Sequence, residues 1–335
     1  MKMRQPPPPI ARSLNSVELL TLIVFLTAGT LSKAAEAPHT LGPVSPAITD
    51  TDSAAELKKI EDADDAAQAE VNTWLRENNA LKEKGTGSSE AEIERRIAAR
   101  FEPVRRKYED FVRRHPGDAR AHLVYGSFLN DRQDENGARV QWEQALALDP
   151  ANPAIYNNLA GRYSESGPVN KAFEYFAKAI ELRPAEPVYY HNFADSLYVL
   201  RNRAATYYGL SEQQVYGKSL LLYSNALRLD PTNFAFARDL AQTFYSLKPL
   251  PTDAALSAWT NALSIGRDEA DREDVYVHLA RVKMLAGRLM EAREQLQAVT
   301  NQSSLAAKTA LLRNLQEREK QARPNDVPNS GATKP

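Results

Sequence analysis

The chain has no cysteine among its 335 residues. Disulfide bonds, thiolate metal ligands and a cysteine nucleophile are therefore excluded, and the folded state must depend on its apolar core. Histidine is scarce too, and no two of the five histidines lie three to five residues apart, as paired ligands on one helix would. We therefore predict no metal site and no cofactor. The histidines are His39, His115, His122, His191 and His278.

The sequence also lacks an excess of charge and the common catalytic motifs. Its 42 lysine and arginine residues balance 43 aspartate and glutamate residues, so neither nucleic acid nor an anionic membrane is expected as a partner. Gly217-Lys218-Ser219 resembles the end of a phosphate-binding loop, but Glu212 occupies the place of the glycine that such a loop needs. No Gly-x-Ser-x-Gly elbow occurs. We predict no catalytic residue.

Residues 153–184 carry the clearest pattern in the chain. Their apolar and aromatic residues recur at spacings of three and four in two runs, which predicts two helices that each bury one face. Gly167 and Pro168 lie between the runs, where proline lacks the helical amide and glycine raises the entropic cost of a helix. Ala160 and Ala172 are small enough to let two helix axes approach closely. The segment is therefore predicted to be a helix–turn–helix.

The same pattern returns along the chain with a fixed period. Pro116, Pro150 and Pro184 are each 34 residues apart, and residues 119–304 resemble five copies of the tetratricopeptide repeat, which has that period. The signature positions of the first three copies are Tyr125, Gly126, Ala138, Trp142, Ala145, Pro150, Tyr156, Leu159, Ala160, Tyr163, Ala172, Phe176, Ala179, Pro184, Phe193, Ala194, Tyr223, Ala226 and Pro231. The last two copies are carried by Leu240, Ala241, Phe244, Ala255, Trp259, Ala262, Tyr276, Leu279, Ala280, Ala292, Leu296 and Val299.

This resemblance implies an all-α fold, a superhelical solenoid of about five helix–turn–helix repeats. Members of the family bind another protein or an extended peptide in a concave groove lined by the first helix of each repeat. Leu123 and Ser127 stand where members that clamp a chaperone's C-terminal carboxylate need lysine and asparagine, so that specificity is not expected. Carried onto this sequence, the groove positions are Arg120, Leu123, Ser127, Asn157, Glu165, His191, Asp195, Tyr198, Arg238, Gln242, Tyr245 and Arg281.

Residues 1–37 are predicted to be an export signal. A basic start that includes Lys2 and Arg4 precedes the short apolar run Leu19–Leu31, and small residues suited to a signal peptidase follow it. The run is shorter than the roughly 20 apolar residues that cross a bilayer, which favours a cleaved signal. We therefore expect the protein in the periplasm or secreted. The alternative is an uncleaved signal that anchors the chain in the inner membrane.

Residues 38–52 are rich in proline, threonine, serine and alanine and are predicted to be a linker. Residues 53–118 are predicted to form helices in front of the repeats, with apolar residues at heptad spacing over 57–81. Two interpretations stay open for that seam: the helix folds back on its neighbour, or it pairs with a second copy in a coiled coil. Ser89 and Glu92 have the spacing of a capping box that opens the next helix.

An insertion at 198–216 separates the two helices of the third copy. Seven of the 14 tyrosines lie in residues 189–223, and tyrosine suits binding surfaces because it offers a large ring with a polar tip. The alternative is that these rings only extend the contact between two lengthened helices. Residues 305–322 are predicted to be an amphipathic capping helix, and residues 323–335 a disordered polar tail.

Two functional hypotheses from different classes follow. The first is an exported, non-enzymatic scaffold or adaptor that binds a peptide or protein in the groove of the repeats. The second is a helical-solenoid enzyme that acts on envelope glycan, with the groove carboxylates Glu165 and Asp195 as its acid and nucleophile. Because the sequence offers no catalytic motif, we favour the scaffold.

Overall fold

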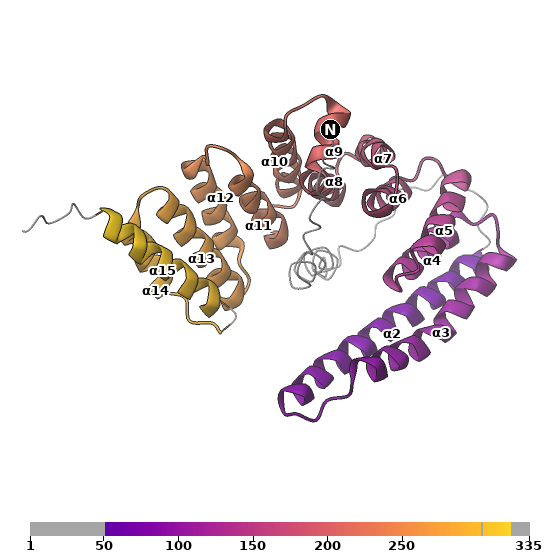
Figure 1. Ribbon diagram of the computed structural model, residues 1–335. Helices are drawn as coiled ribbons and strands as arrows, with labels where there is room; N and C mark the ends of the chain where they lie inside the picture. Colours follow the sequence, from indigo (N-terminus) through magenta and orange to yellow (C-terminus); the bar gives the residue numbers. More distant parts are fainter. Residues whose placement is uncertain (1–50, 303, 323–335) are drawn as a thin grey trace, which may run out of the picture. The chain divides into compact units, whose positions relative to one another are not determined.

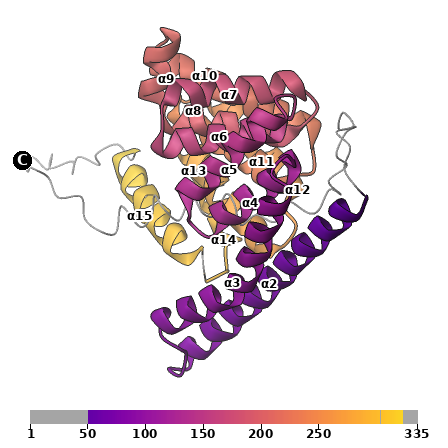
Figure 2. The ribbon, with the colours of Figure 1, turned by 90° about the vertical axis from the view of Figure 1, so that its right-hand side faces the viewer.

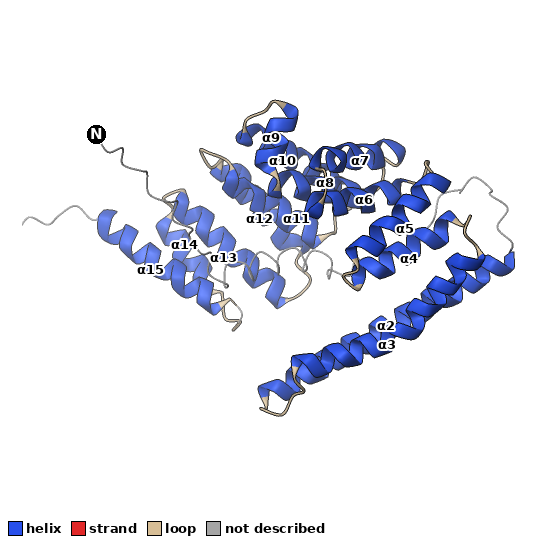
Figure 3. Cartoon of the chain, turned by 45° about the vertical axis from the view of Figure 1, so that its right-hand side comes forward, coloured by secondary structure: helices blue, strands red, loops and turns tan. Residues whose placement is uncertain are grey.

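A computed structural model describes residues 51–302 and 304–322, and every regular element in them is a helix (Figures 1 and 3). The predicted all-α class is confirmed. The expected export signal, nearly all of the linker and the predicted tail lie outside the described residues. The helices are α2 (Thr51–Glu83), α3 (Glu90–Arg114), α4 (Ala119–Asp131), α5 (Glu135–Leu148), α6 (Pro153–Ser166), α7 (Val169–Leu182), α8 (Pro187–Val199), α9 (Arg201–Tyr208), α10 (Glu212–Leu229), α11 (Phe234–Thr243), the 3₁₀ turn η1 (Phe244–Ser246), α12 (Thr252–Ile265), α13 (Glu269–Leu285), α14 (Leu289–Gln297) and α15 (Leu305–Ala322).

The repeat region consists of five helical hairpins, α4–α5, α6–α7, α8–α10, α11–α12 and α13–α14, each made of two helices that pack together. The second helix of each hairpin also packs against the first helix of the next one. Each hairpin therefore covers an apolar face that its neighbour would otherwise expose, which is the physical basis of a repeat solenoid. The predicted solenoid of about five repeats is confirmed.

Short polar side chains begin the first helices of four repeats: Asp118, Asn152, Asn233 and Asp268. The carboxylate of Asp118 accepts a hydrogen bond from a backbone amide three residues later at 3.0 Å. The side-chain oxygens of Asn152 and Asn233 accept from amides in the first turn at 3.1 and 3.3 Å. These bonds satisfy amides that have no partner inside the helix. The sequence thus fixes where these first helices start.

Most signature residues form the core between the helices. Tyr125, Gly126, Ala138, Trp142, Ala145, Leu159, Ala160, Tyr163, Ala172, Phe176, Ala179, Phe193, Ala194, Tyr223 and Ala226 are buried. The prolines Pro150, Pro184 and Pro231 are exposed in the turns that end the repeats. Tyr156 departs from the core role expected of it, because its ring is half-buried and its hydroxyl donates to the carbonyl oxygen of Pro150 at 3.1 Å. Its hydroxyl thereby ties the start of α6 to the preceding turn.

In the first repeat, Gly126 on α4 lies directly against the ring of Trp142 on α5. A Cβ atom added at Gly126 would lie 2.5 Å from Cδ1 and Nε1 of the Trp142 ring. We therefore predict that Gly126→Ala destabilises the protein, because overpacking costs roughly 1–3 kcal/mol, whereas the better helix propensity of alanine returns only about 1 kcal/mol. Urea unfolding followed by circular dichroism measures the change.

Gly161, in the middle of α6, is the matched control. A Cβ atom added there meets nothing within 4 Å. Gly161→Ala should therefore stabilise the protein by up to about 1 kcal/mol through helix propensity alone. If Gly126→Ala stabilised the protein to the same extent as Gly161→Ala, the close packing against Trp142 would be contradicted.

The N-terminal helices α2 and α3 pack against each other and lie side by side (Figure 2). The seam predicted at 57–81 is used inside the chain: Leu57, Ile60, Ala67 and Val71 are buried in one core with Phe101, Val104, Tyr108 and Phe111 of α3. Leu81, at the end of the seam, is 45% exposed. This arrangement matches the interpretation that the helix folds back on its neighbour. The same residues cannot also face a second copy, so the predicted homo-oligomer through this helix is not supported.

The two polar residues in the seam have specific partners. The side chain of Asn78 accepts from the amide of Ser88 at 2.7 Å and donates to its carbonyl oxygen at 3.4 Å, so it holds the loop before α3. Asp64 accepts from the hydroxyl of Tyr108 at 3.4 Å. Burial raises the pKa of Asp64 to about 6, against the opposing effect of Arg132. Both polar residues therefore belong to the α2–α3 hairpin.

The insertion at 198–216 runs from the end of α8 through the short helix α9 into the start of α10. Gly209 ends α9 with a φ of 65°, a conformation that suits glycine. The rings of Tyr207 and Tyr208 lie 5.5 and 5.7 Å from the ring of Phe173 on α7. These two tyrosines therefore extend the packing of neighbouring helices, and only Tyr207 is substantially exposed, at 37%.

The last helix, α15, packs against α13 and α14 through Leu311 and Leu315. The loop before it is held by Glu273, whose side chain is fully buried at the start of α13. Its carboxylate accepts hydrogen bonds from the amide of Thr300 at 2.9 Å, from the Thr300 hydroxyl at 2.7 Å and from the amide of Asn301 at 2.5 Å.

None of the helices in residues 51–302 and 304–322 is long and apolar enough to span a membrane.

Candidate functional site

Side chains on the first helices of successive repeats are joined to one another by hydrogen bonds. We call this set the first-helix face. It runs over α4, α6, α8, α11 with η1, and α13. Its members are Ser127, Asn157, Asn158, Ser164, His191, Asn192, Ser196, Tyr198, Asp239, Tyr245, Ser246 and His278.

In the N-terminal half of the face, small amides and hydroxyls make the links. The side chain of Asn158 donates to Ser127 Oγ at 3.4 Å, which joins α6 to α4. The side chain of Asn192 donates to Asn157 Oδ1 at 3.0 Å, and the hydroxyls of Ser164 and Ser196 are 2.8 Å apart. These two bonds join α8 to α6.

In the C-terminal half, larger groups make the links. The ring of His191 on α8 bonds to Asp239 on α11 at 2.9 Å. The hydroxyls of Tyr198 and Ser246 are 2.9 Å apart. The hydroxyl of Tyr245 donates to the carbonyl oxygen of His278 at 3.2 Å, which joins η1 to α13. Five successive repeats are therefore connected along one set of side chains.

This face contains or adjoins most of the predicted groove residues. Ser127, Asn157, His191, Tyr198 and Tyr245 belong to the face itself. Their polar groups are partly used in holding neighbouring repeats together, which the repeat pattern alone did not indicate.

Four further groove candidates lie beside these residues. Gln242 and Arg281 are exposed, and Arg238 is half-buried. The guanidinium of Arg281 lies 4.6 Å from the centre of the Tyr245 ring. Asp195 contacts His191. These side chains give the face an accessible edge of polar, charged and aromatic groups.

Three groove candidates have other partners. The guanidinium of Arg120 is 3.0 Å from Glu61 on α2. Leu123 packs against the core of the N-terminal half, and its carbonyl oxygen accepts from the indole nitrogen of Trp142 at 3.1 Å. Glu165 forms an ion pair with Arg162. Each of these three residues therefore has a partner within the fold.

The Arg162 guanidinium lies at a shallow hollow of about 220 Å³ between the start of α5 and the end of α6. It is 3.4 Å from Glu135, which also lines the hollow, and it pairs with Glu165 as well. Arg139, a further lining residue, pairs with Glu143 at 2.9 Å. The charges of this hollow are thus compensated within the protein.

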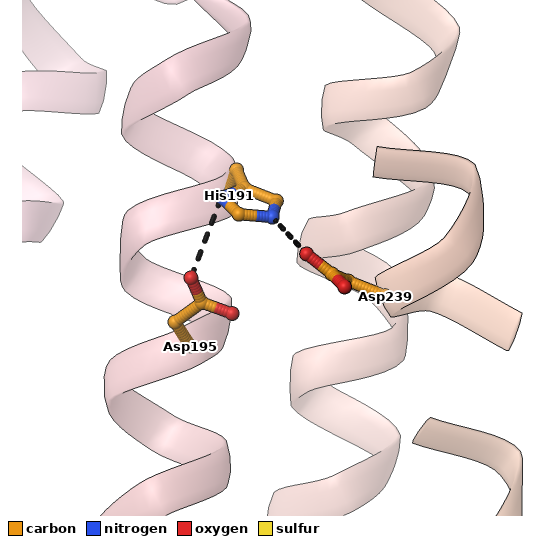
Figure 4. Close-up of side chains that lie close together, drawn as sticks. All are labelled: His191, Asp195 and Asp239. Atoms are coloured by element: carbon orange, nitrogen blue, oxygen red, sulfur yellow. Dashed lines mark hydrogen bonds and ion pairs between the residues drawn. The ribbon is translucent and has the colours of Figure 1, made fainter. Parts of the chain in front are cut away.

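His191 is the most heavily connected residue of the first-helix face (Figure 4). Its Nε2 is 2.9 Å from Asp239 Oδ2, and its Nδ1 is 3.4 Å from Asp195 Oδ2. The two carboxylates approach the ring from different sides (Figure 4). The ring also stacks on Phe236, with 4.7 Å between the ring centres. We call His191, Asp195 and Asp239 the His191 cluster.

The electrostatics of the cluster favour a charged pair. Burial of the His191 ring opposes its protonation, but the charge of Asp195 and the hydrogen bond to Asp239 outweigh that effect and raise the pKa of His191. Burial would raise the pKa of Asp239, but its bond with His191 and the charge of Arg238 lower it overall. Burial raises the pKa of Asp195. The arrangement suits an imidazolium held between carboxylates.

The spacing of the histidines does not reveal this cluster, because it contains only one histidine. His191 and Asp195 are four residues apart and share one face of α8, which the sequence does show. Asp239 comes from the next repeat, beyond the insertion, and only the fold brings it to the ring. One ligand atom from each of the three side chains lies within 4.8 Å of the others. A set of possible metal ligands therefore exists where none was predicted.

No protein-family model matches the sequence. No curated protein matches it either. Among solved structures, it is similar to MamA at 17% identity, with 63% of this chain and 98% of that chain covered and a TM-score of 0.44. It is similar to YrrB, described as a TPR protein with an unusual peptide-binding site, at 14% identity. The match covers 62% of this chain and 97% of that chain, with a TM-score of 0.49. It is also similar to PilF of Pseudomonas aeruginosa at 18% identity. That match covers 61% of this chain and 87% of that chain, with a TM-score of 0.45.

The assignment of the repeats rests on the chain's own features. Its hairpins follow the 34-residue spacing of Pro116, Pro150 and Pro184. Gly126 and Trp142 are in close contact, and they stand 34 residues before Ala160 and Phe176 of the next copy. The described residues therefore form an all-α solenoid of helical hairpins whose spacing resembles that of the tetratricopeptide repeat, and its first helices carry a connected polar face.

Proposed function

We propose that this chain is a non-enzymatic scaffold that binds another protein, or an extended segment of one, along its first-helix face. The observation that carries the proposal is the series of hydrogen bonds between successive first helices. Those bonds fix the positions of side chains such as Asn157 and Tyr245 before any partner arrives. Groups that are already ordered cost less conformational entropy on binding.

The side chains at the edge of the face suit a protein partner. Arg281 and Tyr245 stack on each other, and arginine and tyrosine are the residue types that most often dominate binding energy at interfaces. Gln242 is exposed on α11 and offers both a donor and an acceptor to a main chain. We infer that this C-terminal half of the face makes the strongest contacts.

We further propose that the protein acts in the cell envelope or outside the cell. The support is the basic start and short apolar run within residues 1–37, which have the features of an export signal. An adaptor in that location would bring envelope or secreted proteins together.

A binding experiment with paired variants tests the scaffold. Partners would be captured from native envelope extract by the protein and by the variant Gln242→Ala with Arg281→Ala. Both side chains are exposed, so the variant should keep its helix content and melting temperature. We expect it to retain the specific partner at least about tenfold less well, a loss of roughly 1.4 kcal/mol of binding free energy.

The control variant carries Gln144→Ala and Asn261→Ala, which are exposed positions on second helices. It should bind the partner as the unchanged protein does. If the control lost the partner to the same extent, or if the first-helix variant retained it fully, binding through this face would be wrong.

The glycan-cleaving alternative gains no support from the two carboxylates that motivated it. Glu165 is paired with Arg162. Asp195 contacts His191 and accepts a hydrogen bond from the hydroxyl of Tyr223. Although burial raises the pKa of Asp195, no observation places it opposite Glu165 across a substrate.

A further inference from the structure

The His191 cluster offers the donor atoms of a transition-metal site. An imidazole nitrogen and two carboxylate oxygens are the ligands that Zn²⁺ and related divalent metals accept in proteins. His191 and Asp195 project from one face of α8, and Asp239 projects toward them from α11 (Figure 4). Two neighbouring repeats therefore contribute to one set of ligands.

The distances are close to those that a metal needs. With bonds of 2.0–2.2 Å, ligand atoms around a tetrahedral zinc ion lie about 3.4 Å apart. His191 Nε2 and Asp239 Oδ2 are 2.9 Å apart, so one metal ion can reach both atoms. Asp195 Oδ2 lies 3.4 Å from the other ring nitrogen, Nδ1. The whole set lies within 4.8 Å. The Asp195 side chain is 47% exposed, so a rotation of this carboxylate can bring its oxygen to the nitrogen that faces Asp239.

The groups around the cluster orient its ligands. The hydroxyl of Tyr223 donates to Asp195 Oδ1, and Arg238 Nε lies 3.3 Å from Asp239 Oδ1. Asp239 thus has one oxygen held by Arg238 and directs the other to His191 Nε2. Asp195 Oδ2 faces Nδ1 instead and must turn to join the same metal ion, while Oδ1 is the oxygen that Tyr223 contacts. Phe236 fixes the plane of the ring by stacking. Metal sites in proteins use such surrounding bonds to orient their ligands.

We propose that His191, Asp195 and Asp239 bind one divalent transition-metal ion of the zinc class and so join the third repeat to the fourth. Water completes the coordination. A proton on His191 occupies the cluster when the metal is absent, and the metal displaces it. The proposal goes beyond the scaffold function, because it concerns the connection between two repeats and not the partner.

Zinc binding to the full chain tests the proposal. The protein would be treated with a chelator, dialysed and titrated with Zn²⁺ alone by calorimetry. We expect one equivalent to bind to the protein, and we expect Asp239→Asn to weaken binding at least about tenfold. Zn²⁺ should also raise the melting temperature of the protein but not that of Asp239→Asn, since a ligand of the folded state stabilises it.

Asp274→Asn provides the matched control. Asp274 and His278 are also four residues apart on one helix, with 3.9 Å between Oδ1 and Nε2, but no third ligand joins them from residues 51–302 or 304–322. This variant should bind Zn²⁺ as the unchanged protein does. The absence of saturable binding, or an equal loss in Asp239→Asn and Asp274→Asn, would overturn the proposal. Binding that survives Asp239→Asn would place the metal at other histidines and would overturn it too.

Discussion

Trp142→Ala is expected to lower the free energy of unfolding by about 4 kcal/mol, because replacing a buried tryptophan with alanine typically costs 3–5 kcal/mol. The Trp142 side chain is 3% exposed. Its ring fills the space over Gly126, and its indole nitrogen donates to the carbonyl oxygen of Leu123 at 3.1 Å. The substitution therefore removes both the packing and the hydrogen bond that connect α4 with α5. Urea unfolding measures the loss.

Val140→Ala is the control for that loss. Val140 lies on the same helix, α5, and is 43% exposed. Its substitution should change the free energy of unfolding by no more than about 0.5 kcal/mol. Hydrogen exchange adds a second measurement. In Trp142→Ala, exchange should accelerate more at the amides of α4 and α5 than at those of distant repeats, since each repeat contacts only its neighbours. Equal losses from the two substitutions would contradict the core position of Trp142.

Acid is expected to remove about 3 kcal/mol of stability between pH 6.5 and pH 4 through His278. Burial, with the charges of Arg281 and Arg238, lowers the pKa of His278 from 6.5 to about 4. In the unfolded chain the ring takes up its proton near pH 6.5, while the folded ring resists until about pH 4. The unfolded state thus binds more protons in that interval, and stability falls as the pH falls.

The surroundings of His278 explain why the folded protein keeps its ring neutral. The ring stacks on the indole of Trp259, with 4.1 Å between the ring centres and 2° between their planes. The Asp274 carboxylate is 3.9 Å away, but burial raises its own pKa, so it offers a weaker negative charge as the pH falls. The hydroxyl of Tyr245 adds no charge to the site.

His278→Gln isolates this effect. The side-chain amide of glutamine keeps a flat polar group beside Trp259 but does not titrate. The loss of stability between pH 6.5 and pH 4 should therefore be smaller in the variant by most of the roughly 3 kcal/mol that the lowered pKa of His278 implies. Thermal or urea unfolding at several pH values measures it. An unchanged pH profile in the variant would show that another group titrates there. His191 has the opposite effect on the pH dependence of stability. Because its pKa is raised in the folded protein, its contribution to stability is lost as the pH rises.

The contacts of the first-helix face could be predicted from the sequence only in part. The repeat pattern correctly brought Asn157, His191, Tyr198 and Tyr245 to the first helices. It did not show that they bond to the next repeat. Nor does the repeat pattern indicate the contact between Arg120 and Glu61, because Glu61 belongs to α2, outside the repeats.

The sequence by itself determined the helices, their starts and the hairpin order. Those features depend on local chemistry: the period of apolar residues, the capping side chains Asn152 and Asn233, and the prolines between repeats. Only the tertiary structure decided that the seam of α2 is buried against α3 and that Asp239 reaches His191 past the insertion at 198–216. Periodicity tells which face of a helix is buried, but the partner of that face depends on the path of the chain between distant segments.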